Sequence, residues 1–348
     1  MRSLRVEHPG PRGSFVEWDR FVESRAEASI FHHPAWAAAL TDAYGFEPVV
    51  LTHVDGDGRI QAGARFLAVR SWLTGRRLIS MPFTDYCPVL ARDEQAQGEY
   101  AAALVSWRRA GQHPRMEVHG ELPETSGIHA VPQGVRHVLS LGRAPDELYR
   151  SLKGTQVDRS IRKAARSGVA VRFDSTHDAI RTYYRLHCST RRRQGVPVQP
   201  RRFFDRLWER LIAQGYGTVA IAEHDGEAIA GAVFLGWNGH LIYKYGASNP
   251  DWWSLRPNHL LFWKVIERAC EEGYEVLDFG KTEPENHGLR EFKRRWGAEE
   301  VPLAYATATE RSSGTQGRVP TRAVGTMIRR TPLAVGRAMG ELLYEHFA

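Results

Sequence analysis

Hydrophobic and polar positions in the first part of the chain alternate between a helical period and a strand period. Residues 33–45, HPAWAAALTDAYG, have apolar positions at helical spacing, and alternating positions follow at Val49–Thr52. The turn residues Asp55-Gly56-Asp57-Gly58 lead into a second alternating stretch at Ile60–Val69, so this part predicts a β-hairpin. Two further strands are expected at residues 77–82 and 118–120, with a helix between them at residues 94–109.

A similar order of elements returns in the second half. Expected strands at 218–223, 228–236 and 241–246 precede an expected helix at 257–272. Ala62-Gly63-Ala64 with Phe66-Leu67 recurs as Ala230-Gly231-Ala232 with Phe234-Leu235, each time after a turn that contains glycine. Chance could produce such short strings, but the shared order favours duplication. The fold class expected is α/β (α+β), with two similar domains, each a mixed central sheet flanked by helices.

The segment between the two halves is strongly basic and is expected to form an inserted pair of helices. Arg159, Arg162, Lys163 and Arg166 are spaced by three or four residues, which places them on one helical face. This face could meet several phosphate oxygens, or it could simply be solvated. After Thr190, the run Arg191–Arg193 with Gly195 and two prolines predicts a rigid loop that favours an anion nearby.

The expected domain limits follow from these patterns and from the composition of the tail. We expect an N-terminal domain at 1–145 and a C-terminal domain at 146–306 that includes the basic helical segment 150–215. Residues 307–321 are rich in Gly and Ser and are expected to form a linker. Residues 322–348 are expected to form a basic amphipathic helix, which could lie on an anionic membrane or pack back on the body.

Length, composition and charge narrow the class of protein. A chain of 348 residues is long enough for roughly two domains. With 42% hydrophobic and 25% charged residues, the chain is not disordered or coiled coil as a whole. A net charge of +7 indicates anionic partners. The three cysteines have no CxxC spacing, and the N-terminal stretch has no apolar core of a signal peptide, so we expect a cytoplasmic protein, either free or peripheral at the inner membrane face.

Motif searches exclude several enzyme classes and leave one dense segment. The sequence has no GxSxG, GxxxxGK[ST], HExxH or GxGxxG motif, and no histidine spacing that indicates a metal site, so no metal is expected. Residues 277–297, LDFGKTEPENHGLREFKRRWG, predict a strand at Val276–Phe279, an exit at Gly280 and a short helix at Gly288–Arg294. Lys281 and Lys293 are candidates to stabilise negative charge on a substrate carbonyl, or they are solvated.

Four strings in order along the chain resemble a known family. YKYGAS (243–248), RPNHLLFW (256–263), DFGKTEPEN (278–286) and FKRRWG (292–297) are similar to the FemA/FemB/FemX (FemAB) group of the GNAT acyltransferase superfamily, including its BioF2-like acetyltransferase branch. The resemblance covers most of the chain and implies tandem GNAT-like domains. It also implies transfer of an aminoacyl group from aminoacyl-tRNA to an amine of a peptidoglycan precursor.

The resemblance also implies roles for individual residues. Lys293 would stabilise the oxyanion or the tRNA end, with Phe292 beside it, and Lys293→Ala is expected to lose turnover while the protein stays folded. The phosphate-binding residues would be Arg193, Arg162 and Lys163. The residues lining the acceptor cleft would be Tyr243, Tyr245 and Ser248, with Asp85 and Tyr86 as further candidates, although Asp85 could equally cap a turn. Two departures from the family pattern are Ala37–Ala39, where some Fem proteins have lysines, and Lys281, where a second glycine would follow Gly280.

The donor is expected to be aminoacyl-tRNA, with no bound cofactor. GNAT enzymes that use acyl-CoA carry a glycine-rich phosphate loop, whereas residues 254–261 here read SLRPNHLL. Acyl-CoA remains the alternative donor because Arg256, Asn258 and His259 could bind phosphate through their side chains. The acceptor would bear an amine and be phosphorylated or lipid-linked. A non-catalytic RNA- or membrane-binding protein is the alternative of another class, and it predicts binding that weakens with salt.

Overall fold

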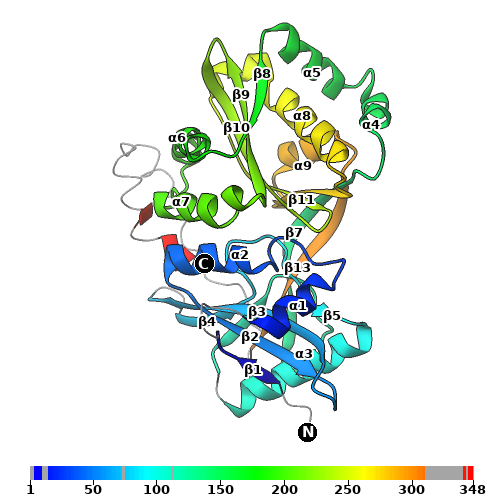
Figure 1. Ribbon diagram of the computed structural model, residues 1–348, viewed down its shortest axis with the longest axis vertical. Helices are drawn as coiled ribbons and strands as arrows, with labels where there is room; N and C mark the ends of the chain where they lie inside the picture. The colour runs from blue at the N-terminus through cyan, green and yellow to red at the C-terminus, as the bar shows by residue number, and fades with distance from the viewer. Residues whose placement is uncertain are drawn as a thin grey trace. The chain divides into compact units, whose positions relative to one another are not determined.

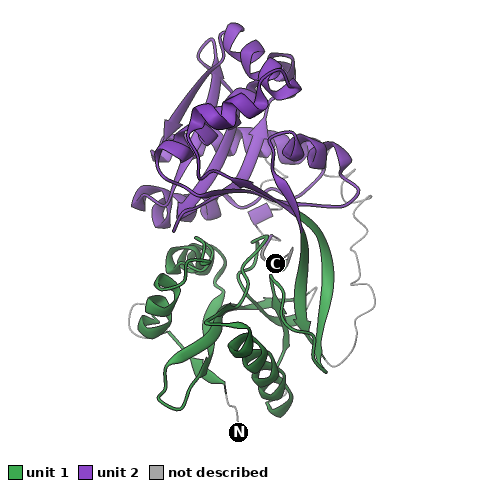
Figure 2. Ribbon diagram, turned by 90° about the vertical axis from the view of Figure 1, so that its right-hand side faces the viewer, with its two compact units in different colours: residues 1–135, 302–318, 345–348 green, residues 136–301, 319–344 purple. Residues whose placement is uncertain are grey.

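The computed structural model describes residues 4–9, 15–72, 75–111, 113–309, 340–341 and 344–347. The chain divides into two compact units (Figure 2). The first contains residues 1–135, 302–318 and 345–348, and the second contains residues 136–301 and 319–344. Strands β7 (Ile128–Ser140) and β13 (Glu299–Ala308) contain residues of both units. The domain limits expected from the sequence, 1–145 and 146–306, remain a prediction.

The first unit forms around a mixed sheet and the helix α3 (Figure 1). Its elements are β1 (Arg5–Glu7), α1 (Val16–Glu23), α2 (Pro34–Tyr44), β2 (Glu47–Val54), β3 (Ile60–Ser71), β4 (Gly75–Ile79), β5 (Leu90–Ala91), α3 (Glu94–Ala110) and β6 (Arg115–Val118). The order is β1-β2-β3-β4-β6-β13, antiparallel except for the parallel pair β4 and β6, and β5 pairs with β3. The predicted hairpin and both helices are confirmed.

The strand expected at 77–82 begins and ends earlier, at Gly75–Ile79. Met81 and Phe83 have left-handed backbone, with φ of 64° and 60°, which interrupts a strand. The Ser80 hydroxyl donates to the Cys87 carbonyl (3.0 Å) and accepts from the His119 amide (2.8 Å). These bonds satisfy buried backbone groups that a continuing strand would have paired.

The second unit has the same kind of sheet with helices on both faces (Figure 1). Its elements are α4 (Pro145–Leu152), α5 (Gln156–Arg166), β8 (Ala170–Asp174), α6 (His177–Gln194), α7 (Arg201–Arg210), β9 (Gly217–His224), β10 (Glu227–Trp237), β11 (His240–Ser248), α8 (Pro257–Glu271), β12 (Val276–Thr282) and α9 (His287–Arg294), with short 3₁₀ turns at Ile212–Gln214 and Pro250–Leu255. The order is β12-β11-β10-β9-β8, with β11 and β12 parallel and the other pairs antiparallel. Helices α5 and α8 cover one face, and α6 and α7 cover the other.

Both units place three antiparallel strands before a helix and a parallel strand. In the first unit β4 and β6 pair over three residues each, Arg77–Ile79 and Arg115–Glu117. In the second unit β11 and β12 also pair over three residues each, His240–Ile242 and Val276–Asp278. The expected α/β fold, with a similar order of strands in each half, is therefore confirmed.

Two elements of the second unit extend beyond their predicted ends. The segment Arg191–Arg193, expected as a loop, is the last turn of α6, which ends at Gly195 with φ of 73°. Arginine is a good helix former, and cations are favoured near a helix C-terminus, so this helix continues where charge repulsion alone predicts a loop. Strand β12 continues past Gly280 to Thr282.

The expected tail falls mostly outside the described residues. Of the expected linker 307–321, residues 307–309 are described, and Thr307 and Ala308 belong to β13. Of the expected helix 322–348, the described residues are 340–341 and the 3₁₀ turn Tyr344–Phe347. Within the described ranges no helix combines the length and the apolar character needed to cross a membrane.

Candidate active site

A cavity of about 240 Å³ lies in the second unit where β11 and β12 stop pairing. Beyond the paired residues, β11 continues to Ser248 and supplies one wall, while α9, which follows β12, supplies another. The carboxyl ends of parallel strands are a common position for ligand sites in open sheets. The lining residues come from α6, β10, β11, α8 and α9: Thr190, Arg193, Gln194, Gly231, Ala232, Tyr243, Gly246, Ala247, Ser248, Asn258, Leu261, Phe262, Leu289 and Phe292.

Arg193 provides the guanidinium group of this cavity. Its Nη1 donates to the Ser248 carbonyl (3.2 Å), and the guanidinium carbon lies 5.0 Å from the ring centre of Trp253. The Trp253 indole in turn donates to the Ser248 hydroxyl (2.8 Å). Burial lowers the pKa of Arg193, but an arginine keeps its charge at neutral pH. Arg193 is therefore held by one carbonyl and one ring and keeps donors for an anionic ligand.

Tyr243 is oriented into the site by an irregularity in β11. Val233 pairs with Tyr245 and Phe234 pairs with Tyr243, so Lys244 is an extra residue in the strand. A bulge of this kind reverses the side-chain alternation, and Tyr243 and Tyr245 therefore face opposite sides of the sheet. Tyr243 packs against Phe262 of α8 (4.9 Å between ring centres), whereas Tyr245 packs against Phe204 of α7 (5.5 Å).

Gly246 gives the Tyr243 hydroxyl its place. A Cβ atom at residue 246 would lie 1.7 Å from that hydroxyl oxygen. Burial raises the pKa of Tyr243 to about 12, so the phenol is protonated at neutral pH. Among the described residues the hydroxyl has no hydrogen-bond partner. It is thus a proton-bearing group beside the cavity.

Asn258 and Phe292 complete the cavity from α8 and α9. Asn258 lies in the first turn of α8, and in the described part of the chain its side-chain amide makes no hydrogen bond. Phe292 packs edge-on against His259 and Phe262, at 5.4 and 5.7 Å between ring centres. Burial lowers the pKa of His259 to about 4, so this histidine is neutral near pH 7. The amide and the phenol are the neutral hydrogen-bonding groups brought to this end of the cavity.

Lys293 does not line the cavity, contrary to the role that the resemblance implies. Its side chain is buried, and the ammonium group donates to the Gly280 carbonyl (2.8 Å), the Lys281 carbonyl (3.1 Å) and the Thr282 hydroxyl (2.8 Å). An ammonium group has three protons, and these three acceptors use them. Lys293 therefore ties α9 to the end of β12. Lys281, with its ammonium 4.0 Å from the Glu283 carboxylate, also lies outside the lining.

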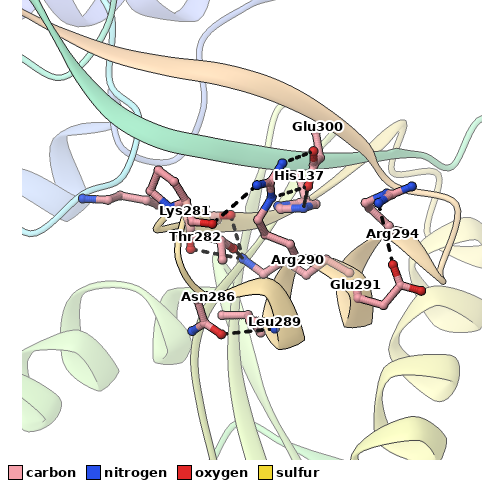
Figure 3. Close-up of polar contacts among 12 residues, drawn as sticks. His137, Lys281, Thr282, Asn286, Leu289, Arg290, Glu291, Arg294 and Glu300 are labelled. Atoms are coloured by element: carbon pink, nitrogen blue, oxygen red, sulfur yellow. Dashed lines mark hydrogen bonds and ion pairs between the residues drawn. The ribbon is translucent and has the colours of Figure 1, made fainter.

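A second set of contacts fixes α9 from its other side (Figure 3). Arg290 makes two hydrogen bonds to the Glu300 carboxylate, at 2.9 and 2.7 Å, and His137 Nε2 lies 3.1 Å from the same group. The hydrogen bonds from Arg290 lower the pKa of Glu300 to about 2. At the start of the helix, the Asn286 side chain accepts from the Leu289 amide (3.2 Å). These contacts hold the helix that carries Phe292 and Leu289.

The remaining predicted residues are not among those that line the cavity. Arg162 and Lys163 lie on the exposed face of α5, and Arg162 pairs with Asp158 at 2.8 Å. Tyr245 faces α7, as described above. Asp85 and Tyr86 belong to the first unit, where the Asp85 carbonyl accepts from the Tyr305 hydroxyl (3.1 Å). The cavity therefore gathers Arg193, Tyr243, Ser248, Asn258 and Phe292 from the predicted set.

Sequence reasoning missed three contributors to the site. Thr190 lies one turn before Arg193, and its hydroxyl accepts from the Ser248 amide (3.3 Å). Trp253 holds Arg193 from the 3₁₀ turn that follows β11. Gly246 has no unusual position in its sequence string, so the close approach of the Tyr243 hydroxyl has no local signal. The threonine could have been found from its helical spacing to Arg193.

The lining defines the chemistry that the cavity can support. Among its described residues there is one cation, Arg193, and there is no carboxylate or histidine. Such a lining favours an anionic or neutral polar ligand, because a cationic ligand would find no negatively charged side chain there. A phenol and an amide near an arginine suit transfer of an acyl group, in which a carbonyl oxygen gains negative charge and a leaving group needs a proton.

Comparisons with known proteins agree with this arrangement. The acetyltransferase (GNAT) domain family matches residues 153–294, which include all the residues that line the cavity. A lipid II:glycine glycyltransferase of Staphylococcus haemolyticus is 34% identical over 87 residues, or 23% of this chain. The match spans about a fifth (21%) of that relative's length.

Solved structures extend the similarity of the fold to most of the chain. The crystal structure of FemX superposes with a TM-score of 0.68 over 88% of this chain and 98% of that chain, at 16% identity. A tandem GNAT protein from the clavulanic acid biosynthesis pathway superposes with a TM-score of 0.56 over 90% of this chain and 100% of that chain, at 11% identity. The matched family therefore shows a GNAT acetyltransferase domain at residues 153–294, and the solved structures show that most of the chain has the fold of FemX and of a tandem GNAT protein.

Proposed function

We propose that this protein transfers an aminoacyl group to an amine of a cell-wall precursor, and that the cavity beside Arg193 and Tyr243 holds the reacting ester. The observation that carries the proposal is the grouping of a phenol, an amide and a guanidinium around one cavity of a GNAT domain. The name of the glycyltransferase relative, which specifies lipid II, supports the class of acceptor. A lipid-linked acceptor bears phosphate, which Arg193 can bind with its remaining donors.

The proposed chemistry follows from what each group can do. The amine attacks the ester carbonyl, and negative charge develops on the carbonyl oxygen, where the Asn258 amide is a suitable donor. The leaving alkoxide needs a proton, and the Tyr243 phenol, whose pKa is about 12, carries one at neutral pH. The resulting phenolate takes the proton that the attacking nitrogen loses as the amide forms, so that the phenol is restored. Because the described lining has no carboxylate or histidine to act as base, the attacking amine would have to arrive uncharged. Lys293 and Arg290 act by positioning α9.

The donor that we propose is aminoacyl-tRNA. Residue 256, at the start of α8, is an arginine with left-handed backbone (φ 61°) in the place where a glycine-rich phosphate loop would lie. The guanidinium group of an arginine at this position can bind the phosphates of an RNA backbone, and it can also bind a single phosphate. Acyl-CoA is the second candidate, since Asn258 and His259 lie in the first turn of the same helix. Contact of the C-terminal segment with the membrane remains a prediction.

The test is a product assay with matched variants. The purified chain is incubated with lipid II and either charged tRNA or acyl-CoA, and the acceptor is examined by mass spectrometry. We expect the mass of the acceptor to increase by one aminoacyl residue only when charged tRNA is the donor. Product formed only with acyl-CoA would make acyl-CoA the donor, and no product with either donor would overturn the proposed function.

Arg193→Gln and Arg192→Gln form the matched pair for the binding role. Both remove one positive charge from the last turn of α6, but Arg192 is exposed and does not line the cavity. We expect Arg193→Gln to raise the KM for the phosphate-bearing substrate by at least about tenfold, the effect of losing a charged hydrogen bond of roughly 1.5–3 kcal/mol. Arg192→Gln should change KM less than about twofold. Equal effects of the two variants would refute the role of Arg193.

A further inference from the structure

A second cavity, in the first unit, is lined by apolar side chains together with arginines and one carboxylate, Glu47. Its volume is about 330 Å³, and it lies where the core of that unit ends, against Val49, Ala68, Leu78 and Trp107. Arg70 and Arg76 also line it. It belongs to different elements from the candidate active site, and the proposed transferase chemistry makes no use of it.

The sheet itself explains why two arginines meet there. Alternate residues of β3, namely Ala62, Ala64, Phe66 and Ala68, face the core under α3. Arg70 is the next residue on that face. In the register of β3 with β4, Ala68 lies opposite Leu78, and Arg70 lies opposite Arg76. The apolar face thus ends in two guanidinium groups placed directly across from each other.

Two like charges at such a position destabilise a hairpin unless an anion lies between them. Arg70 has one carboxylate nearby, Glu47, at 3.3 Å, and both of these side chains are mostly exposed. Arg76 is exposed, and its side chain forms no ion pair or hydrogen bond with any residue that the structure describes. The pair of arginines therefore has charge and donors available for an external anion.

A large aromatic side chain lies beside this pair. Trp72 follows β3 directly and has a relative exposure of 75%, with a ring contact to His346 at 5.6 Å between ring centres. An exposed tryptophan next to arginines is the combination that binds the interface of an anionic bilayer, where the indole lies at headgroup level and the cations meet phosphates.

We propose that this end of the first unit docks on an anionic phospholipid surface, with Arg70 and Arg76 on headgroup phosphates and Trp72 at the headgroup level. The arginines and the apolar residues that line the cavity complement a lipid headgroup and the start of its chains. The docking surface is defined by Arg70, Trp72 and Arg76. Binding there needs no transferase activity, so it can be tested whether or not the proposed function holds.

The test measures flotation of the full chain with vesicles. Vesicles of phosphatidylcholine alone are compared with vesicles that also contain phosphatidylglycerol, and we expect binding to the second kind that weakens as salt is added. Arg70→Gln and Arg76→Gln should each weaken binding by about fivefold, which corresponds to roughly 1 kcal/mol per arginine near an anionic surface. Trp72→Ala should also weaken vesicle binding, and its effect should persist at high salt, where the contribution of the aromatic ring remains and that of the charges is screened.

The control is Arg59→Gln, at the opposite end of the same strand. Arg59 precedes Ile60, the first residue of β3, and its side chain is 73% exposed. This variant should bind vesicles as the unchanged protein does. Equal binding by the Arg70→Gln/Arg76→Gln double variant and by Arg59→Gln would overturn the proposal and would assign any membrane binding to another segment. Equal binding to both kinds of vesicle would also overturn it, because the arginines would then make no contribution.

Discussion

Replacing Lys293 by methionine separates a structural role for this residue from a catalytic one. The change keeps most of the side-chain volume and removes the ammonium group. In the folded protein Lys293 is 2% exposed, and its ammonium group donates to the Gly280 carbonyl, the Lys281 carbonyl and the Thr282 hydroxyl. Removing it leaves three acceptors without their donor, and two of them, the Gly280 carbonyl and the Thr282 hydroxyl, are buried.

The expected loss of stability follows from those three bonds. A typical hydrogen bond contributes a net of about 1 kcal/mol, and bonds to charged groups contribute about 1.5–3 kcal/mol. Part of this is offset, because the variant no longer buries a charge. We therefore expect Lys293→Met to lower the free energy of unfolding by about 2–4 kcal/mol. Thr282→Val, which removes one of the three acceptors, should lower it by about 1 kcal/mol.

Urea unfolding followed by circular dichroism measures these differences. Lys264→Met is the matched control, since Lys264 is partly exposed on α8 and pairs with Glu267 at 2.6 Å. It should cost less than about 1 kcal/mol. If Lys293→Met abolished turnover while the unfolding midpoint stayed the same, Lys293 would act on the reacting carbonyl, as the resemblance implies, and the structural reasoning would be refuted.

Two further changes test the site and the core. Gly246→Ala should reduce turnover at least about tenfold, because the new Cβ would lie 1.7 Å from the Tyr243 hydroxyl. Gly288→Ala is the control: its new Cβ would meet nothing within 4 Å, so turnover should be unchanged. Equal rates for the two variants would contradict the placement of Tyr243. Burial lowers the pKa of His187 from 6.5 to about 3, so its contribution to stability is present above pH 6.5 and is lost as the pH falls toward 3. The urea concentration at the unfolding midpoint should therefore decrease as the pH is lowered from neutral to about 4. This decrease should be smaller in His187→Asn than in the exposed control His287→Asn, and an equal decrease in the two variants would argue against a neutral buried His187.

The sequence by itself determined the elements and their duplication. Hydrophobic periodicity is a local property, so it located α2, the β2–β3 hairpin, α3 and the three strands that precede α8. The short strings placed Tyr243, Asn258 and Phe292 in elements that the tertiary structure then brought to one cavity, whereas Arg193 was expected in a loop and lies in the last turn of α6.

The tertiary structure alone decided how those side chains are used. The bulge at Lys244 turns Tyr245 away from Tyr243, because register depends on the partner strand rather than on spacing within β11. Burial of Lys293 depends on where the end of β12 lies beside α9, which no local pattern encodes. The opposition of Arg70 and Arg76 likewise arises from strand pairing. Local sequence sets the type of each element, and the pairing of distant segments sets which face a residue finally occupies and which charges and hydroxyls meet.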